Sequence, residues 1–157
     1  MGCNSNSAQN DERLSESLIV LPDAEKVQRK ELNGTIQINY HLNEKYPASK
    51  SISLIDAKLQ SKGWIPLKYD ELNFSAPTAL ETGWTKSKEQ ISGAEVHVWY
   101  SIWKNGTGDY IKYHFQYFAP EHNIEKQDSL LVAGILVPAM TANRILDQVK
   151  SINEKNK

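Results

Sequence analysis

Alternating polar and apolar side chains near the start of the folded part predict a β-hairpin. Residues 35–42 alternate strictly between polar and apolar, which is typical of a strand with one buried face. Residues 27–32 form a second strand-like run, and Asn33-Gly34 separates the two. Asn-Gly is favoured in two-residue hairpin turns because both positions adopt positive φ. The pattern therefore predicts an antiparallel hairpin.

Two later segments show helical spacing. The first opens at Pro47-Ala48, runs to about Lys62 and stops at Gly63, since glycine commonly ends helices; its apolar stripe is Ile52, Ile55 and Leu59. The second opens at Pro138-Ala139, and its stripe is Ala142, Ile145, Leu146, Val149 and Ile152. Both stripes recur at three- and four-residue intervals, as in amphipathic helices.

The rest of the chain supplies further strands. Residues 64–67 predict a short edge strand, residues 68–92 a long loop, residues 94–104 and 109–119 a second hairpin, and residues 130–137 a central strand. We expect an α+β domain: a twisted antiparallel sheet of five to six strands with both helices packed on one face. The order is compatible with a degenerate ββα repeat or with coincidence.

The second hairpin carries the candidate surface. With residues 105–108 counted as a four-residue turn, the aliphatic sides of its two strands coincide and so do the mixed sides. If the helices cover the aliphatic side, the other side is exposed. Aromatic side chains among polar ones suit a binding surface, although cross-strand aromatic pairs also stabilise sheets by themselves. The predicted surface consists of Glu95, His97, Trp99, Trp103, Tyr110, Lys112 and His114.

The same count places two imidazoles across from each other. His97 and His114, with Glu95 nearby, form a hypothetical three-ligand metal set. Polar pairs on a wet sheet face are commoner than metal sites, so we expect no metal and no cofactor, and a metal or small-ligand carrier remains an alternative.

Composition narrows the function classes. The net charge is -1, which argues against nucleic acid as a partner, because phosphate-binding proteins usually carry a basic excess. No apolar stretch reaches the roughly 20 residues that cross a bilayer. The sequence has no nucleophile elbow, P-loop, dinucleotide-binding motif or zinc-protease motif. We therefore expect no catalytic residues and no enzyme.

The N-terminal segment differs from the rest of the chain. Residues 1–16 are mainly small or polar and aperiodic, and they are expected to form a disordered leader ahead of a single domain at residues 17–157. Cys3 is the sole cysteine. Gly2-Cys3 followed by an Asn- and Ser-rich tether resembles the mature start of a bacterial lipoprotein, in which the cysteine carries a diacylglycerol.

That resemblance has several implications. Met1 would replace a signal peptide, and Asn4 after the anchor would favour the outer membrane. Met-Gly-Cys is also similar to a myristoylated glycine beside a palmitoylated cysteine, but that motif requires Ser or Thr where this chain has Asn6. An accidental cysteine in a disordered tail is the third interpretation.

Together these observations predict a cell-envelope lipoprotein. We expect a non-catalytic module that faces the periplasm and binds a protein or ligand, with the membrane as a second partner through Cys3. A periplasmic immunity or inhibitor protein is the narrower alternative, and a carrier using His97 and His114 is the other.

Overall fold

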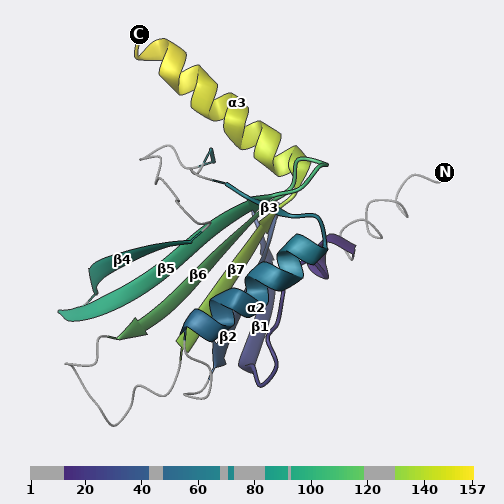
Figure 1. Ribbon diagram of the computed structural model, residues 1–157. Helices are drawn as coiled ribbons and strands as arrows, with labels where there is room; N and C mark the ends of the chain where they lie inside the picture. The colour runs from purple at the N-terminus through teal and green to yellow at the C-terminus, as the bar shows by residue number, and fades with distance from the viewer. Residues whose placement is uncertain (1–12, 43–47, 68–70, 73–83, 92, 119–129) are drawn as a thin grey trace.

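The computed structural model describes residues 13–42, 48–67, 71–72, 84–91, 93–118 and 130–157. Within these residues, seven strands form one antiparallel sheet in the order β1-β2-β7-β6-β5-β3, and β4 also pairs with β5 (Figure 1). Strands β3 and β4 share one edge of β5, at successive positions along it. The strands are β1 (Glu25–Leu32), β2 (Thr35–Leu42), β3 (Ile65–Pro66), β4 (Trp84–Ile91), β5 (Ala94–Lys104), β6 (Tyr110–Phe118) and β7 (Leu130–Val137).

The α+β class and the antiparallel sheet are confirmed. The sheet has one strand more than expected, because β4 lies within the segment predicted as a loop at 68–92. Its sequence, WTKSKEQI, is too polar to show the alternation that marks a half-buried strand. Pairing with the whole first part of β5 is what orders it.

The first hairpin has the predicted turn. Leu32 pairs with Thr35, which leaves Asn33 and Gly34 as the two turn residues. Their φ angles are 52° and 76°, as a type I′ turn requires. In β2, alternate residues are buried, and they are the apolar ones. This hairpin is therefore confirmed in position, turn type and burial.

Helix α2 (Ala48–Ser61) covers one face of the sheet (Figure 1). Ile55 and Leu59 of α2 are fully buried in a cluster with side chains from β2, β6 and β7. We call this side the covered face. The strand residues of its core are Ile36, Ile38, Tyr40 and Leu42 of β2, Trp84 of β4, Trp103 of β5, Ile111, Tyr113 and Phe115 of β6, and Leu130, Val132 and Leu136 of β7.

Helix α3 (Ala139–Lys155) packs on the opposite face, so the prediction that both helices share one face is not confirmed. Its buried Ala142 and half-buried Ile145 and Leu146 join a second cluster with Ile102 and Tyr110. Strand residues alternate between faces, and this second set alternates with the first. Beyond these first turns α3 projects past the sheet (Figure 1).

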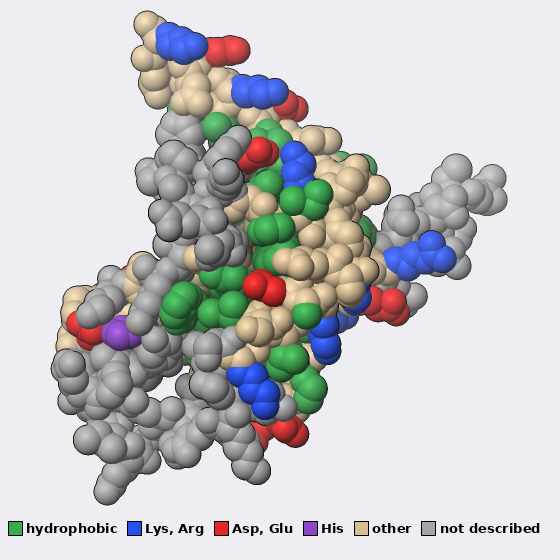
Figure 2. All heavy atoms as spheres, viewed as in Figure 1, with side chains coloured by type: hydrophobic (Ala, Val, Ile, Leu, Met, Phe, Trp, Pro, Cys, Tyr) green, Lys and Arg blue, Asp and Glu red, His purple; other side chains and the backbone are tan. Residues whose placement is uncertain are grey.

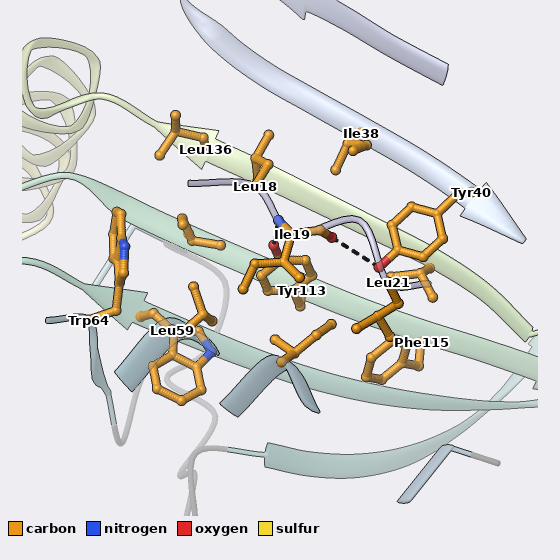
Figure 3. Packing of buried hydrophobic residues seen from close by; sticks show 14 of the residues in the cluster. Leu18, Ile19, Leu21, Ile38, Tyr40, Leu59, Trp64, Tyr113, Phe115 and Leu136 are labelled. Carbon is orange, nitrogen blue, oxygen red and sulfur yellow. Dashed lines mark hydrogen bonds between the residues drawn. The ribbon is translucent and has the colours of Figure 1, made fainter. Parts of the chain in front are cut away.

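A segment before β1 is built into the core. The Ile19 backbone N–H donates to the Tyr113 hydroxyl at 2.7 Å, and the Tyr40 hydroxyl donates to the Ile19 carbonyl at 3.0 Å (Figure 3). Burial raises the pKa of both tyrosines. Both hydroxyls thus stay neutral and satisfy backbone groups that would otherwise be costly to bury.

Gly134 makes room for this arrangement. A Cβ atom there would lie 2.8 Å from the Tyr113 ring, 2.9 Å from Ile38 and 3.3 Å from Leu18. Only the absence of a side chain lets β7 pass beneath the tyrosine ring and the incoming segment.

The folded part also begins before the predicted boundary at residue 17. Arg29 donates to the Ser15 hydroxyl at 2.8 Å and to the Ser15 carbonyl at 3.1 Å. Lys62 donates to the Glu16 carbonyl at 3.1 Å. Residues 1–12 of the predicted leader lie outside the described residues.

Candidate functional site

The loop between β5 and β6 decides which candidate residues share a face. β5 ends at Lys104 and β6 begins at Tyr110, so the loop has five residues and not the expected four. The Asn105 N–H donates to the Asp109 carbonyl at 3.1 Å, and Gly108 adopts a φ of 88°. Lys104 then pairs with Tyr110.

Asp109 belongs to the loop, where its buried carboxylate accepts three hydrogen bonds. One oxygen accepts the backbone N–H of Ala139 at 2.7 Å, at the first turn of α3. The other accepts from Asn105 at 2.9 Å and from Thr107 at 2.7 Å. A carboxylate at a helix N-terminus satisfies an unpaired donor and complements the helix dipole. This residue therefore joins the hairpin to α3.

The extra loop residue reverses the predicted pairing of faces. A one-residue shift in register moves every side chain of a strand to the other side of the sheet. Trp103 pairs with Ile111, and Ile102 pairs with Lys112. The prediction of one shared surface is thus wrong: Glu95, His97, Trp99 and Trp103 lie on the covered face, and Tyr110, Lys112 and His114 lie on the opposite face.

The same register separates the two imidazoles. His97 pairs with Tyr117, and its Nε2 lies 2.8 Å from Glu95 Oε1. His114 pairs with Tyr100, whose ring it meets edge-on at 4.9 Å between centroids. The hypothesis of a metal site shared by His97 and His114 is therefore wrong. No group of three or more His, Cys, Asp or Glu side chains suited to a metal occurs in the described ranges.

The candidate tryptophans belong to the core. Trp103 is 1% exposed, and its indole N–H donates to the Ser101 hydroxyl at 3.0 Å. Trp99 packs against the same core cluster. Trp103 is buried and cannot contact a partner unless the fold opens, whereas Trp99 keeps intermediate exposure.

A third tryptophan, not predicted, completes the covered face. Trp84 of β4 stacks on Phe115 at 5.0 Å between centroids and 11° between planes. Its indole N–H donates to Asp56 of α2 at 2.5 Å. Burial raises the pKa of the Asp56 carboxyl, and the hydrogen bond from Trp84 opposes that shift. The pair links α2 to the outer part of the sheet.

Tyr110 is buried at the α3 end of the opposite face. Its hydroxyl donates to Glu71 at 2.6 Å, and Lys104 Nζ lies 3.6 Å from the same Glu71 oxygen. Burial, reinforced by the Glu71 carboxylate, raises the pKa of Tyr110. The interaction with Tyr110, ahead of that with Glu71, raises the pKa of Lys104. These contacts hold residue 71 against the hairpin.

Beyond α3, the face opposite α2 is half-exposed across the three central strands. The side chains that point there alternate with the buried core residues, and each keeps intermediate exposure. We call this surface the open face. It consists of Gln37, Asn39 and His41 of β2, Lys112, His114 and Gln116 of β6, and Leu131, Ala133 and Ile135 of β7.

The open face is polar with a bias toward positive charge. Strand pairing extends it to the exposed Gln28 and Lys30 of β1, beside Asn39 and Gln37. Among the open-face positions that the structure describes in β1, β2, β6 and β7, the single carboxylate is Glu25, at the margin beside His41. Amides, imidazoles and ammonium groups dominate, and the small Ala133 lies at the centre between Asn39 and His114.

Two of the predicted surface residues, Lys112 and His114, lie on the open face. Sequence reasoning missed the contributions of β2 and β7. The alternation of β2 already identified Gln37, Asn39 and His41 as its wet side, but the apolar run of β7 suggested a strand buried on both faces. The sequence signal for which β6 residues share a face was Gly108-Asp109, because Asp109 adds a fifth residue to the second hairpin loop.

Cys3, the predicted lipidation site, lies outside the described residues. None of the helices that the structure describes is long and apolar enough to cross a membrane. No protein-family model and no curated protein matches the chain.

Proposed function

We propose that this domain is a non-catalytic binding module whose open face meets an acidic region of a protein partner. The observation that carries the proposal is the asymmetry of the sheet. One face is sealed by α2 and the segment at residues 18–21, whereas the central rows of the other face remain half-exposed.

The shape of the open face favours a protein over a small molecule. Small-molecule sites are usually concave and bury most of the ligand. Here the side chains stand next to one another on three adjacent strands, which makes a broad surface rather than a pocket. Leu131 and Ile135 supply apolar area between the polar rows, and a mixed surface of this kind is common in protein interfaces.

The charge of the open face favours an acidic partner. Lys30 and Lys112 lie in the same cross-strand row, separated by Gln37 and Ile135. Complementary charge increases association rates and fixes orientation more than it increases affinity. We therefore expect binding that weakens as salt concentration rises.

Site-specific photocrosslinking in the source organism tests the proposal. A photoreactive phenylalanine replaces Gln37 on the open face, and the matched control replaces Ala57, an exposed residue of α2. We expect a discrete adduct with one protein from position 37 and none from position 57. Mass spectrometry should map the contact to an acidic segment of that protein.

A charge-reversed variant makes the test specific. Lys30→Glu with Lys112→Glu should lower the adduct yield at least severalfold, while Lys58→Glu with Lys150→Glu, which changes the net charge equally, should not. Equal yields from positions 37 and 57, or equal losses in both charge variants, would contradict the proposal.

We also propose that Cys3 carries a lipid that holds the domain at the outer membrane of a bacterial envelope, facing the periplasm. The Gly2-Cys3 pair and the polar tether after it support this proposal. Intact-mass measurement of the protein isolated from its source should show a diacylglycerol-sized increase that Cys3→Ser abolishes. An unmodified thiol in the isolated protein would contradict it.

A further inference from the structure

We propose that α3 binds a second copy of this chain, antiparallel, through its outward stripe. The stripe consists of Met140, Asn143, Arg144, Asp147, Gln148, Ser151 and Ile152, which are all exposed. It lies opposite the helix side that packs on the sheet through Ala142, Ile145 and Leu146. This inference is independent of the open face.

The stripe has apolar side chains near both ends. Met140 is 85% exposed and Ile152 is 44% exposed, and both are large hydrophobic residues. Between them lie amides and one charge of each sign. Basic and acidic side chains alternate along α3, which projects from the body of the protein (Figure 2).

The order of these residues is self-complementary. Reversal of the helix brings Arg144 opposite Asp147, Asn143 opposite Gln148, and Met140 opposite Ile152. The midpoints of these three pairs coincide to within half a residue, which is about 0.75 Å of helix rise. One twofold axis therefore satisfies all three contacts twice, as an isologous interface requires.

The spacing fits a common mode of helix packing. Met140, Arg144, Gln148 and Ile152 follow one another at four-residue intervals and form one ridge. Asn143, Asp147 and Ser151 form the neighbouring ridge. Ridges of this spacing interdigitate at a crossing angle of about −50°. The ridge of one copy then lies in the groove between the two ridges of the other, with Arg144 beside the partner's Asp147.

The contact is small, so we expect a weak dimer. A helix of 17 residues is about 25 Å long and about 10 Å wide, and one side of it provides less than the roughly 800 Å² per partner of a standard interface. We expect a dissociation constant on the order of 100 µM, which lies in the weak range. Arg144 also donates to the Asn33 carbonyl at 3.3 Å, which leaves further guanidinium donors for the partner.

Sedimentation equilibrium from about 10 to 500 µM protein tests the proposal. We expect a monomer–dimer equilibrium that Arg144→Glu and Asp147→Arg each weaken about tenfold. The double variant exchanges the two charges, and it should restore association to within about threefold of the parent. Lys150→Glu, off the stripe, is the control with the same charge change as Arg144→Glu.

Disulfide trapping tests the orientation. In a Cys3→Ser background, chains with Met140→Cys should cross-link with chains carrying Ile152→Cys faster than either variant cross-links with itself. Circular dichroism and the unfolding midpoint should match the parent in every variant, because the stripe is exposed. A monomer throughout the range, failure of the charge exchange to restore association, or faster self-linking would overturn the proposal.

Discussion

The covered face and the open face of the sheet are built by the same strands but differ in chemistry. On the covered side, aromatic and branched residues of β2, β5, β6 and β7 pack beneath α2 and the segment at residues 18–21. On the open side, the alternate positions of β2 and β6 carry amides, imidazoles and lysine. One face thus supplies folding energy and the other is available for contacts. Antiparallel sheets permit this division because successive side chains point in opposite directions.

Removing the largest covered side chain should produce the largest difference between the faces. We expect Trp103→Ala to lower the free energy of unfolding by about 3–5 kcal/mol, because it leaves a cavity under α2. Gln116→Ala on the open face should change it by no more than about 0.5 kcal/mol. Urea unfolding measures both. Similar losses in the two variants would show that the faces contribute equally.

Filling the space at Gly134 should be the next most damaging change. Gly134→Ala should cost about 1–3 kcal/mol, because overpacking forces the Tyr113 ring and neighbouring side chains to move. Ala133→Ser, one position along β7 but on the open face, is the matched control and should be nearly neutral. Urea unfolding of the pair measures this contrast. An unchanged midpoint for Gly134→Ala would mean that the core accommodates a methyl group there.

The hydrogen bonds that Tyr113 and Tyr40 make with the Ile19 backbone allow a test at a single residue. Tyr113→Phe removes the acceptor of the Ile19 N–H, and an unsatisfied buried donor costs about 1–3 kcal/mol. Hydrogen exchange at Ile19 should accelerate more than exchange within β7. Tyr100→Phe, on the opposite side of the sheet, is the comparison and should leave Ile19 protection unchanged. Equal acceleration at Ile19 and in β7 would indicate global destabilisation rather than release of the segment.

The smallest expected effect is a pH dependence at Asp56. Burial raises its folded-state pKa above the usual 3.8, so the folded chain keeps a proton that the unfolded chain loses first. Its favourable contribution is full below the unfolded pKa and is lost as pH rises through the folded value.

Asp56→Asn has no such proton. The stability of the parent relative to this variant should therefore fall as the pH rises from below 3.8 through the raised pKa of Asp56, as measured by urea unfolding at several pH values. A difference that stays constant across this range would contradict the assignment.

The sequence predicted the fold where local signals were strong. The turn at Asn33-Gly34 and the alternation of β2 are properties of adjacent residues, and the structure confirms both. The face of α3 was not predictable in this way. The apolar residues Ala142, Ile145 and Leu146 identify which side of α3 is buried. The face of the sheet on which that side packs depends on where β7 ends and on the capping contact from Asp109.

The prediction of the candidate surface was wrong because of one residue, Asp109. Asp109 looks like the first residue of a strand, but its carboxylate caps α3 and leaves its backbone in the loop. The parity of β6 then changes, so that Trp103 is buried in the core and the half-buried Trp99 packs against it. The contact between Asp109 and α3 is distant in sequence. The register that it accompanies could not be predicted from the residues of the hairpin alone.

The anchoring of Ile19 has a mechanical consequence. A pull on the N-terminus reaches the fold at residues 13–21, where Tyr113 and Tyr40 hold both backbone groups of Ile19 while Leu18 and Leu21 are buried. The load therefore passes into two central strands as well as into β1, whose Arg29 holds Ser15. A chain tethered through this end would resist extension until the two tyrosine bonds broke and Leu18 and Leu21 left the core.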